Sequence, residues 1–464
     1  MSGACGTVGV VDADTVLAGL DDDQRQVVQA WGAPVAVLAG AGTGKTRVIT
    51  HRIAYGALTG SIDPGATLAL TFTTTAAAEI RERLARMGVA HVQARTFHSA
   101  CLRQAQFFWP EVYHAALPPV VDKRDGLIAQ ACERLGIAAS EPAIREIDQE
   151  IAWTKQTNVT PEAYVALAAA DHRRLASLTP ESMADAFVAY EEAKQVACVV
   201  DLDDLLLCTV ALLATEPSVA RRVRTTYRHF VFDEFQDVSP VQSRLVELWV
   251  GGRADVTVVG DPAQTIHGFA GARSVYLEHF ADTHPGTLGL TLTRNYRSTA
   301  PILRAAARAG GGTPLTAVRG TGPAVELAAA PDELEESANI AAWLQARHDD
   351  GVAWGDMAVL YRTRRGPEAI RQILADQSVP FGGDGVTLAT LHAAKGREWE
   401  AVAIGGLSEA TMPHPLATGP AQVAEERRTL YVGMTRARTY LLLSWPTTVA
   451  GRPVAVSPFL SDAA

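Results

Sequence analysis

A glycine-rich stretch followed by lysine and threonine is the clearest candidate for chemistry in this 464-residue chain. It lies between the apolar segment 34–38 and a helical pattern that begins at Arg47, and it reads Ala39, Gly40, Ala41, Gly42, Thr43, Gly44, Lys45, Thr46. In such a turn the backbone N–H groups and the positive end of the next helix face an anion. Lys45 is suited to the β- and γ-phosphates, and the Thr46 hydroxyl to Mg²⁺. A turn that merely joins a strand to a helix is the alternative, but it leaves the Gly-Lys-Thr order unexplained, so the sequence predicts a nucleoside triphosphate site.

Two acidic residues, Asp233 and Glu234, directly follow the apolar segment 227–232. A P-loop ATPase carries its active-site acids in this position, with the first in the Mg²⁺ shell and the second orienting and polarising the attacking water. Solvated acids at a strand end are the alternative. Together with Lys45, the pair favours triphosphate hydrolysis.

Three further polar residues are placed to act on the γ-phosphate. Gln264 follows the apolar segment 256–259, whereas Arg297 and Arg436 lie in the second half of the chain, which has no phosphate loop. The arginines stand at predicted strand ends with no local anion, and a planar guanidinium suits the charge that develops on the γ-phosphoryl group. We therefore expect both arginines to reach across a cleft to the nucleotide. Surface arginines in ordinary ion pairs are the alternative.

Aromatic and histidine residues near predicted strand ends are candidates for nucleic-acid contacts. They are Phe72 beside Thr73, Phe97 beside His98, and His267 with Phe269. Ligands bind at the carboxyl ends of parallel strands, and hydroxyls with aromatics suit a phosphate backbone carrying stackable bases. Each has a structural alternative; Phe97 in particular suits a core.

Bulk properties narrow the class of protein. The net charge of −10 gives no hint of nucleic acid, so a local basic groove would have to bind it. The five cysteines form no CxxC pair, which favours reduced thiols in the cytoplasm and gives no sign of a metal site. No basic stretch precedes Arg25, and acids interrupt the most apolar stretch, 196–215, so we expect neither a signal peptide nor a membrane span.

The pattern of strands and helices predicts an α/β fold with two parallel sheets. Residues 1–19 read as loosely structured, and a helix is expected to start at 20–25. There Gln24 has an amide able to read an adenine edge, or is simply an exposed helical residue. We expect a first P-loop core at 1–100 and 222–286, an all-helical insertion at 101–221, and a second core at 287–464 that begins with the strand 290–292.

The ordered motifs resemble those of superfamily 1 DNA helicases of the UvrD/Rep/PcrA type over nearly the whole chain. After Gln24 they are AGAGTGKT, TFTTTAAAEI, TFHSA, DLDDLL, DEFQD, VGDPAQTIHGF, LTRNYRS, TLHAAKGREWE and EERRTLYVGMTRA. The resemblance implies two RecA-like cores that close on ATP and step along single-stranded DNA, typically 3′ to 5′.

The same resemblance assigns roles to individual residues. It implies that Gln24 and Tyr296 hold adenine and that Glu398 contacts the nucleotide near its sugar; residues 39–47, Arg297 and Arg436 complete the nucleotide set. The residues it places along DNA are Phe72, Thr73, His98, His267, Phe269, Arg362, Thr390 and His392. Base stacking on aromatic rings works for any sequence, as a protein that walks along DNA requires.

Three features depart from the family pattern. Thr74 and Thr75 stand where an Asn-Lys pair is usual, and Gly268 to Ala272 lacks the usual tryptophan and arginine. From Arg297 to His392 there are only 392 − 297 = 95 positions. This leaves no room for the helical accessory domain, called 2B, that precedes the TLHAAKG-like motif in the family, and a Gly-Gly-Asp-Gly turn stands there instead. We hypothesise a minimal motor, freed from that domain's restraint but short of duplex contacts.

The expected function is an ATP- and Mg²⁺-dependent 3′–5′ DNA helicase in repair or replication restart. Its expected partners are single-stranded DNA, junctions with duplex, and repair proteins. One alternative is a translocase on single strands without efficient strand separation. Another is a non-catalytic DNA-binding scaffold, which the presence of Lys45, Glu234 and Arg436 disfavours. A small-molecule kinase would need no second core with arginines.

Overall fold

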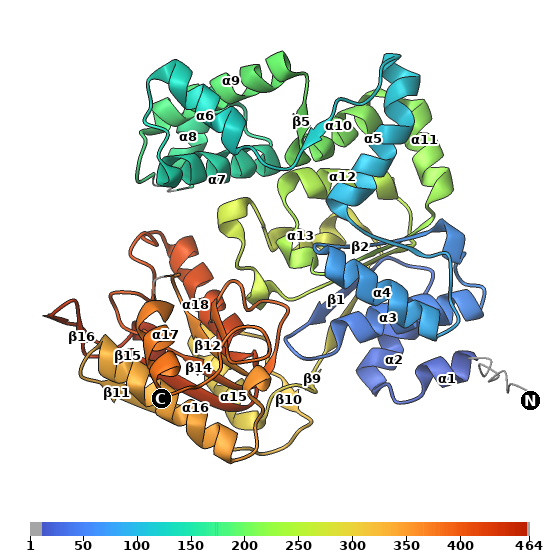
Figure 1. The fold of residues 1–464 in the computed structure, drawn as a ribbon. Helices are drawn as coiled ribbons and strands as arrows, with labels where there is room; N and C mark the ends of the chain where they lie inside the picture. The colour runs from blue at the N-terminus through green and yellow to red at the C-terminus, as the bar shows by residue number, and fades with distance from the viewer. Residues whose placement is uncertain (1–11, 172, 174, 365, 462–464) are drawn as a thin grey trace, which may run out of the picture. The chain divides into compact units, whose positions relative to one another are not determined.

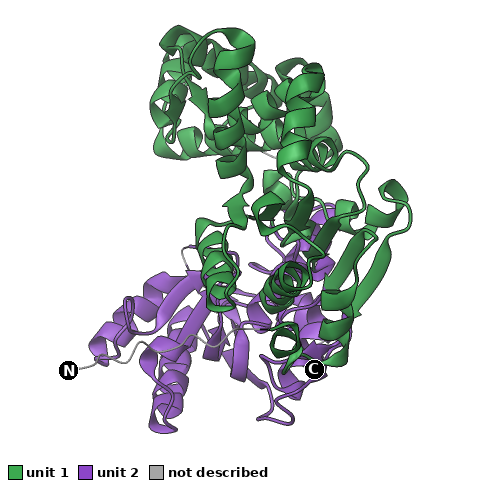
Figure 2. Cartoon of the chain, turned by 90° about the vertical axis from the view of Figure 1, so that its right-hand side faces the viewer, with its two compact units in different colours: residues 1–38, 45–260, 267–291 green, residues 39–44, 261–266, 292–464 purple. Residues whose placement is uncertain are grey.

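The computed structural model describes residues 12–171, 173, 175–364 and 366–461, so Cys5 and the rest of 1–11 lie outside the described residues. The chain divides into two compact units (Figure 2). Unit 1 comprises 1–38, 45–260 and 267–291, and unit 2 comprises 39–44, 261–266 and 292–464. The phosphate-loop residues before Lys45 and the segment around Gln264 are thus grouped with the second half of the chain.

Unit 1 is built on a six-stranded sheet of order β3-β2-β6-β7-β1-β8. Figure 1 labels its strands β1 and β2. The strands are β1 (Val35–Ala39), β2 (Thr67–Thr71), β3 (Gln93–Thr96), β6 (His229–Phe232), β7 (Val256–Gly260) and β8 (Leu288–Leu292). Pairing from β3 through β1 is parallel. Strands β2 and β7 are buried along their whole length, as expected for aliphatic strands covered on both faces. The expected start of the second core at residue 287 was wrong, because β8 forms the edge of this sheet and unit 1 continues to Thr291.

Helices pack around the sheet of unit 1. A mainly helical insertion lies in the chain between β3 and β6. The surrounding helices are α2 (Asp22–Gln29), α3 (Lys45–Leu58), α4 (Thr74–Arg86), α5 (Phe97–Tyr113), α10 (Leu202–Thr215), α11 (Pro217–Thr226), α12 (Pro240–Val250), α13 (Val275–Glu278) and α14 (Phe280–Thr283). The insertion holds α6 (Asp125–Leu135), α7 (Glu141–Thr157), α8 (Pro161–Ala170) and α9 (Pro180–Ala197), which lie together in Figure 1. These four helices share a core of their own that includes Ile147, Tyr164 and Tyr190.

Two predictions for unit 1 need correction. The insertion is not all-helical, because β4 (Val120–Val121) and β5 (Val200–Asp201) form a short parallel pair at its base. Residues 12–19 are not loose, because Asp12 caps a short helix, α1 (Ala13–Leu17), by accepting a hydrogen bond from the Thr15 N–H at 2.7 Å.

Unit 2 contains a five-stranded, parallel sheet of order β11-β15-β14-β12-β13. Its strands are β11 (Glu326–Ala330), β12 (Met357–Tyr361), β13 (Thr387–Thr390), β14 (Trp399–Ile404) and β15 (Ala437–Pro446). Its helices are α15 (Ala300–Gly310), α16 (Glu333–Asp349), α17 (Pro367–Asp376), α18 (Pro420–Met434) and α19 (Pro458–Ser461). The prediction of two α/β cores with parallel sheets is confirmed.

A tight turn lies between α17 and β13, where the family pattern has the accessory domain that the sequence lacks. The chain passes from α17 to β13 through residues 377–386, where the Gly382 N–H donates to the Val386 carbonyl at 3.0 Å. Gly382 and Gly383 both adopt positive φ, which glycine tolerates without steric cost.

The remaining elements are short. They are β9 (Arg294–Asn295), β10 (Thr316–Ala317), β16 (Thr448–Val449), β17 (Arg452–Pro453), and the 3₁₀ turns η1 (Pro64–Ala66), η2 (Phe235–Asp237), η3 (Pro262–Gln264), η4 (Gly268–Ala270) and η5 (Trp354–Asp356). Within the described ranges, no helix combines the length and the apolar character needed to cross a bilayer.

Candidate active site

The glycine-rich stretch forms the turn that its composition predicts. Gly42 and Gly44 have φ values of 71° and 86°, in the region that favours glycine. The Thr43 hydroxyl donates to the Gly40 carbonyl at 2.9 Å and closes the turn. Helix α3 then begins at Lys45, so the N–H groups of its first turn and its positive dipole end belong to the same segment as the turn.

Lys45 and the two acids lie together in unit 1. The Lys45 Nζ is 3.9 Å from the Glu234 Oε2, and the Glu234 N–H donates to the Asp233 Oδ1 at 2.9 Å. The pKa of Asp233 is raised to about 7, mainly because the carboxyl group is buried and secondly because the charge of Glu234 is close to it. Glu234 adopts a φ of 53°, an uncommon conformation for a residue with a side chain and one that clusters at functional sites. Thr46, half-buried, follows Lys45 on α3.

Asn295, the last residue of β9, holds the phosphate-loop residues of unit 2 against the bend that carries Arg297. Its Nδ2 donates to the Ala41 carbonyl at 2.5 Å, and its Oδ1 accepts the Arg297 N–H at 2.9 Å. The Tyr296 N–H donates to the Gly42 carbonyl at 2.8 Å. A Cβ at Gly42 would lie 2.7 Å from the Arg297 Cβ, so only glycine permits this approach. Asn295 was not among the predicted site residues, although its place directly before Tyr296 and Arg297 in the LTRNYRS motif is a signal that the sequence offers.

Gln264 and Arg436 contact each other in unit 2. The Arg436 Nη2 lies 3.3 Å from the Gln264 Oε1, and the Gln264 Nε2 donates to Asp261 at 2.7 Å. Arg436 is buried, and its Nε donates to the Val432 carbonyl at 2.9 Å, so the surface ion-pair alternative does not describe it. Lys395, which was not among the predicted site residues, donates to the Gln264 carbonyl at 2.7 Å.

Arg297 does have a local anion, contrary to the expectation. Its Nε forms an ion pair with Glu398, whose other oxygen accepts from Arg438 at 2.5 Å. Burial alone would raise the pKa of Glu398, but the two arginines outweigh it and lower the pKa below its ordinary value. The sequence could not reveal this pair because 101 positions separate its members.

The two adenine candidates differ in exposure. Gln24 is 1% exposed and shares a capping box with Asp21 at the start of α2, so the exposed-glutamine alternative was wrong. The Tyr296 side chain is exposed. Arg47 donates to the Gly19 carbonyl at 3.0 Å, which ties the start of α3 to the segment before α2.

The DNA candidates that directly follow β2 and β3 differ in burial and in their contacts. Phe97 is 2% exposed and stacks near Phe232, which makes it a core residue. Phe72 packs partly against the same core, and Thr73 caps α4 by accepting the Ala76 N–H at 3.1 Å. His98 remains partly exposed, with its Nε2 at 3.7 Å from Asp203 on α10.

The DNA candidates His267 and Phe269 of unit 1 combine a histidine with an exposed aromatic ring. The His267 Nδ1 lies 3.5 Å from the buried Asp237, and its ring meets that of Phe269 edge-on at 6.0 Å. Phe269 is 50% exposed, unlike Phe97, so it is the aromatic candidate available for stacking.

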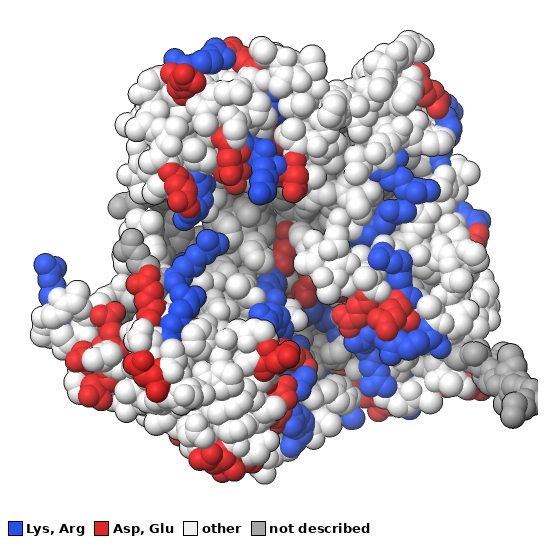
Figure 3. Space-filling model, in the orientation of Figure 1, with Lys and Arg blue, Asp and Glu red and all other residues white. Residues whose placement is uncertain are grey.

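The DNA candidates of unit 2 lie at the ends of β12 and β13. Arg362 makes a bidentate pair with the buried Glu426, at 2.8 and 2.6 Å. The Thr390 hydroxyl accepts the Ala393 N–H at 3.2 Å, and the half-buried His392 follows in the same turn. On the face drawn in Figure 3, basic and acidic side chains are interspersed, in keeping with the net charge of −10.

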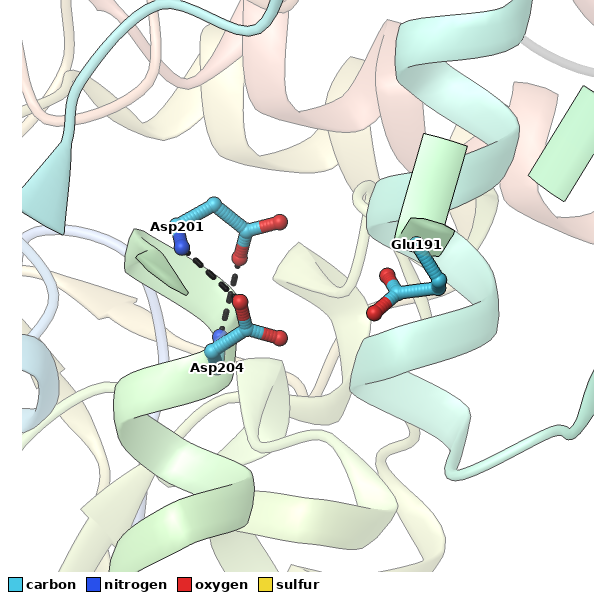
Figure 4. A group of neighbouring side chains, drawn as sticks. All are labelled: Glu191, Asp201 and Asp204. Carbon is cyan, nitrogen blue, oxygen red and sulfur yellow. Dashed lines mark hydrogen bonds between the residues drawn. The ribbon is translucent and has the colours of Figure 1, made fainter. Parts of the chain in front are cut away.

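A cluster of carboxylates in unit 1 resembles a metal site in its spacing (Figure 4). Glu191 on α9 faces Asp201 and Asp204, which form the capping box of α10. The ammonium of Lys155 lies 2.6 Å from both aspartates and 2.9 Å from Glu191, and Lys194 lies 2.5 Å from Asp204. The lysines lower the pKa of Asp201 although burial opposes this. The cluster is therefore a buried ion network that joins the insertion to α10.

Comparison with known proteins places the chain in a family. Residues 20–285 match the model of the UvrD/REP helicase N-terminal domain, and residues 382–448 match that of the UvrD-like helicase C-terminal domain. The ATP-dependent DNA helicase UvrD2 of Mycobacterium tuberculosis is 34% identical, over 94% of this chain and 80% of its own length. That alignment spans 558 positions, so at least 558 − 464 = 94 of them have no counterpart in this chain.

Other relatives match over a smaller share of their length. UvrD1 of M. tuberculosis is 33% identical over 80% of this chain and 50% of its own. The putative helicase YjcD of Bacillus subtilis is 30% identical over 81% and 50%. A crystallised C-terminal domain of a possible helicase from a Lactobacillus superposes on 36% of the chain with a TM-score of 0.29, too weak a likeness to add to the assignment. On the two family models and the UvrD2 match, this chain belongs to the UvrD/REP helicase family.

Proposed function

We propose that this chain is an ATP-dependent DNA helicase that moves 3′ to 5′ along single-stranded DNA, in repair or replication restart. The observation that carries the proposal lies in unit 2, where the backbone of Ala41 and Gly42 is hydrogen-bonded to Asn295 and Tyr296, next to Arg297. A phosphate loop held against a segment that carries an arginine suits transfer of a phosphoryl group, which depends on positioning and electrostatic stabilisation.

Each residue of the proposed ATP site has a distinct task. Lys45 binds the β- and γ-phosphates, Glu234 orients the attacking water and accepts its proton, and Arg297 and Arg436 stabilise charge on the γ-phosphoryl group. Gln264 senses that group while its amide remains fixed by Asp261. Gln24 and Tyr296 hold adenine, and Glu398 lies near the sugar.

Mg²⁺ fits the residues present. The pKa of Asp233 is raised to about 7 because the carboxylate is buried beside Glu234, and a divalent cation would relieve this charge repulsion. Asp233 and Thr46 would hold the ion, which when bound neutralises charge on the phosphate oxygens.

The test is the steady-state ATPase rate with and without a single-stranded oligonucleotide. Single strands should stimulate the wild type, and Glu234→Gln should lower the stimulated rate by about 100-fold or more, the loss expected on removing a general base. Glu247→Gln, which changes an exposed glutamate of α12, is the matched control and should behave as wild type. A wild type indifferent to DNA would exclude the motor and favour the scaffold.

Strand separation needs its own assay because the turn at 377–386 takes the place of a domain. We expect translocation along single strands to be retained and unwinding of a tailed duplex to be weak, compared with a relative that has the domain. A reporter dye at the 5′ or 3′ end of the strand gives the direction of movement. Unwinding as efficient as that of larger relatives would contradict the minimal-motor hypothesis.

A further inference from the structure

Four side chains of unit 1 form a series from the proposed catalytic base to a proposed DNA contact. The Gln236 Nε2 donates to the Glu234 Oε2 at 2.7 Å and lies 3.4 Å from the Asp237 Oδ2. The Asp237 Oδ1 is 3.5 Å from the His267 Nδ1. The amide of one glutamine therefore stands between two carboxylates, one facing the ATP chemistry and the other facing the histidine.

The middle of the series is buried and its ends are accessible. Gln236 is 0% exposed, whereas the side chains of Glu234 and His267 are 28% and 37% exposed. A buried amide that donates to charged groups in a low dielectric makes stronger bonds than it would in water, so its orientation affects both carboxylates.

The surrounding backbone fixes where the amide can lie. A Cβ at Gly260, the last residue of β7, would lie 2.4 Å from the Gln236 Oε1. Glycine at this position therefore allows the amide to pack against the strand. In the turn η2, the Asp237 N–H donates to the Glu234 carbonyl at 2.9 Å. This hydrogen bond fixes the spacing between Glu234 and Asp237.

We propose that Gln236 and Asp237 are positioning residues that make ATP hydrolysis respond to DNA. This inference rests on the proposed function. Without DNA, the Gln236 amide occupies the Glu234 Oε2, so that this oxygen is not available to the attacking water. When a DNA phosphate draws His267 away from Asp237, Asp237 attracts the amide, and the Glu234 oxygen becomes available to the attacking water. The amide is thus a two-position element whose balance the DNA shifts.

The test compares the ATPase rate without DNA and the ratio of stimulated to basal rate in purified full-length variants. Gln236→Ala should raise the basal rate and reduce the stimulation ratio by about tenfold, an effect equal to one ordinary hydrogen bond to a charged group. Asp237→Asn should also reduce the ratio, because its neutral amide attracts neither His267 nor the Gln236 amide as the carboxylate does. Gln242→Ala, which removes another buried glutamine of the same unit, is the matched control and should keep the wild-type ratio.

Gly260→Ala provides a second route if Gln236→Ala folds poorly, since it displaces the amide without removing it. It should reproduce the raised basal rate. A normal ratio in Gln236→Ala and Gly260→Ala would overturn the inference, as would an equal fall of basal and stimulated rates, which indicates a purely structural role. A wild type without DNA stimulation would instead overturn the proposed function.

Discussion

The two sets of candidate ATP-site residues differ in how their charges are satisfied inside the protein. In unit 1, Asp233 and Glu234 adjoin each other with Lys45 at 3.9 Å from Glu234, and the pKa of Asp233 is raised. In unit 2, Arg436 donates to the Val432 carbonyl, and Arg297 pairs with Glu398. In the set of unit 1, two neighbouring carboxylates repel each other, and a bound cation would relieve this repulsion. The set of unit 2 consists of arginines that hydrogen bonds and an ion pair already hold in place. Under the proposed function, Glu234 and Asp233 are the reactive groups, and Arg297 and Arg436 are preorganised cations.

The largest effect should come from removing a preorganised cation. Arg436→Ala should lower the hydrolysis rate in the presence of single-stranded DNA by about 10³-fold, the contribution typical of an arginine that stabilises the phosphoryl transition state. ATP binding should weaken much less. Single-turnover hydrolysis and equilibrium binding of a fluorescent nucleotide separate the two effects. Arg371→Ala, an exposed arginine of α17, serves as control, and a loss below about tenfold would exclude this role for Arg436.

A smaller effect should reveal the repulsion between the carboxylates in unit 1. The pKa of Asp233 is about 7 in the folded chain against an ordinary 3.8, so the folded state binds the extra proton between these values. The free energy of unfolding therefore falls as pH rises through this window, because the ionised carboxylate destabilises the fold. Without nucleotide or Mg²⁺, Asp233→Asn should raise Tm by about 2–4 °C at pH 8 and by clearly less at pH 5, where only part of this window has been crossed.

Asp384→Asn, in the exposed turn before β13, is the control for that measurement and should show no such pH dependence. Equal shifts in Tm for Asp233→Asn at both pH values would show that Asp233 experiences no such repulsion.

The sequence predicted both parallel cores because buried strands and amphipathic helices alternate along the chain. It could not assign β8, since Leu288–Leu292 is an ordinary apolar strand and nothing in its composition selects one sheet over the other. Motif spacing was enough to nominate Lys45, Glu234 and Arg436. The contacts made by Asn295 and Gln236, and the pair between Arg297 and Glu398, depend on tertiary packing between distant segments, which a single sequence does not encode in any local pattern.

The central proposal is that Glu234 and Arg436 act on the same triphosphate. A double-mutant cycle tests it most directly, with Glu234→Gln, Arg436→Ala and the combined variant compared by single-turnover hydrolysis with single-stranded DNA. If both residues serve one transition state, the double variant should be about as slow as the slower single variant, because groups that act as a unit are strongly non-additive. Losses that multiply would contradict the account.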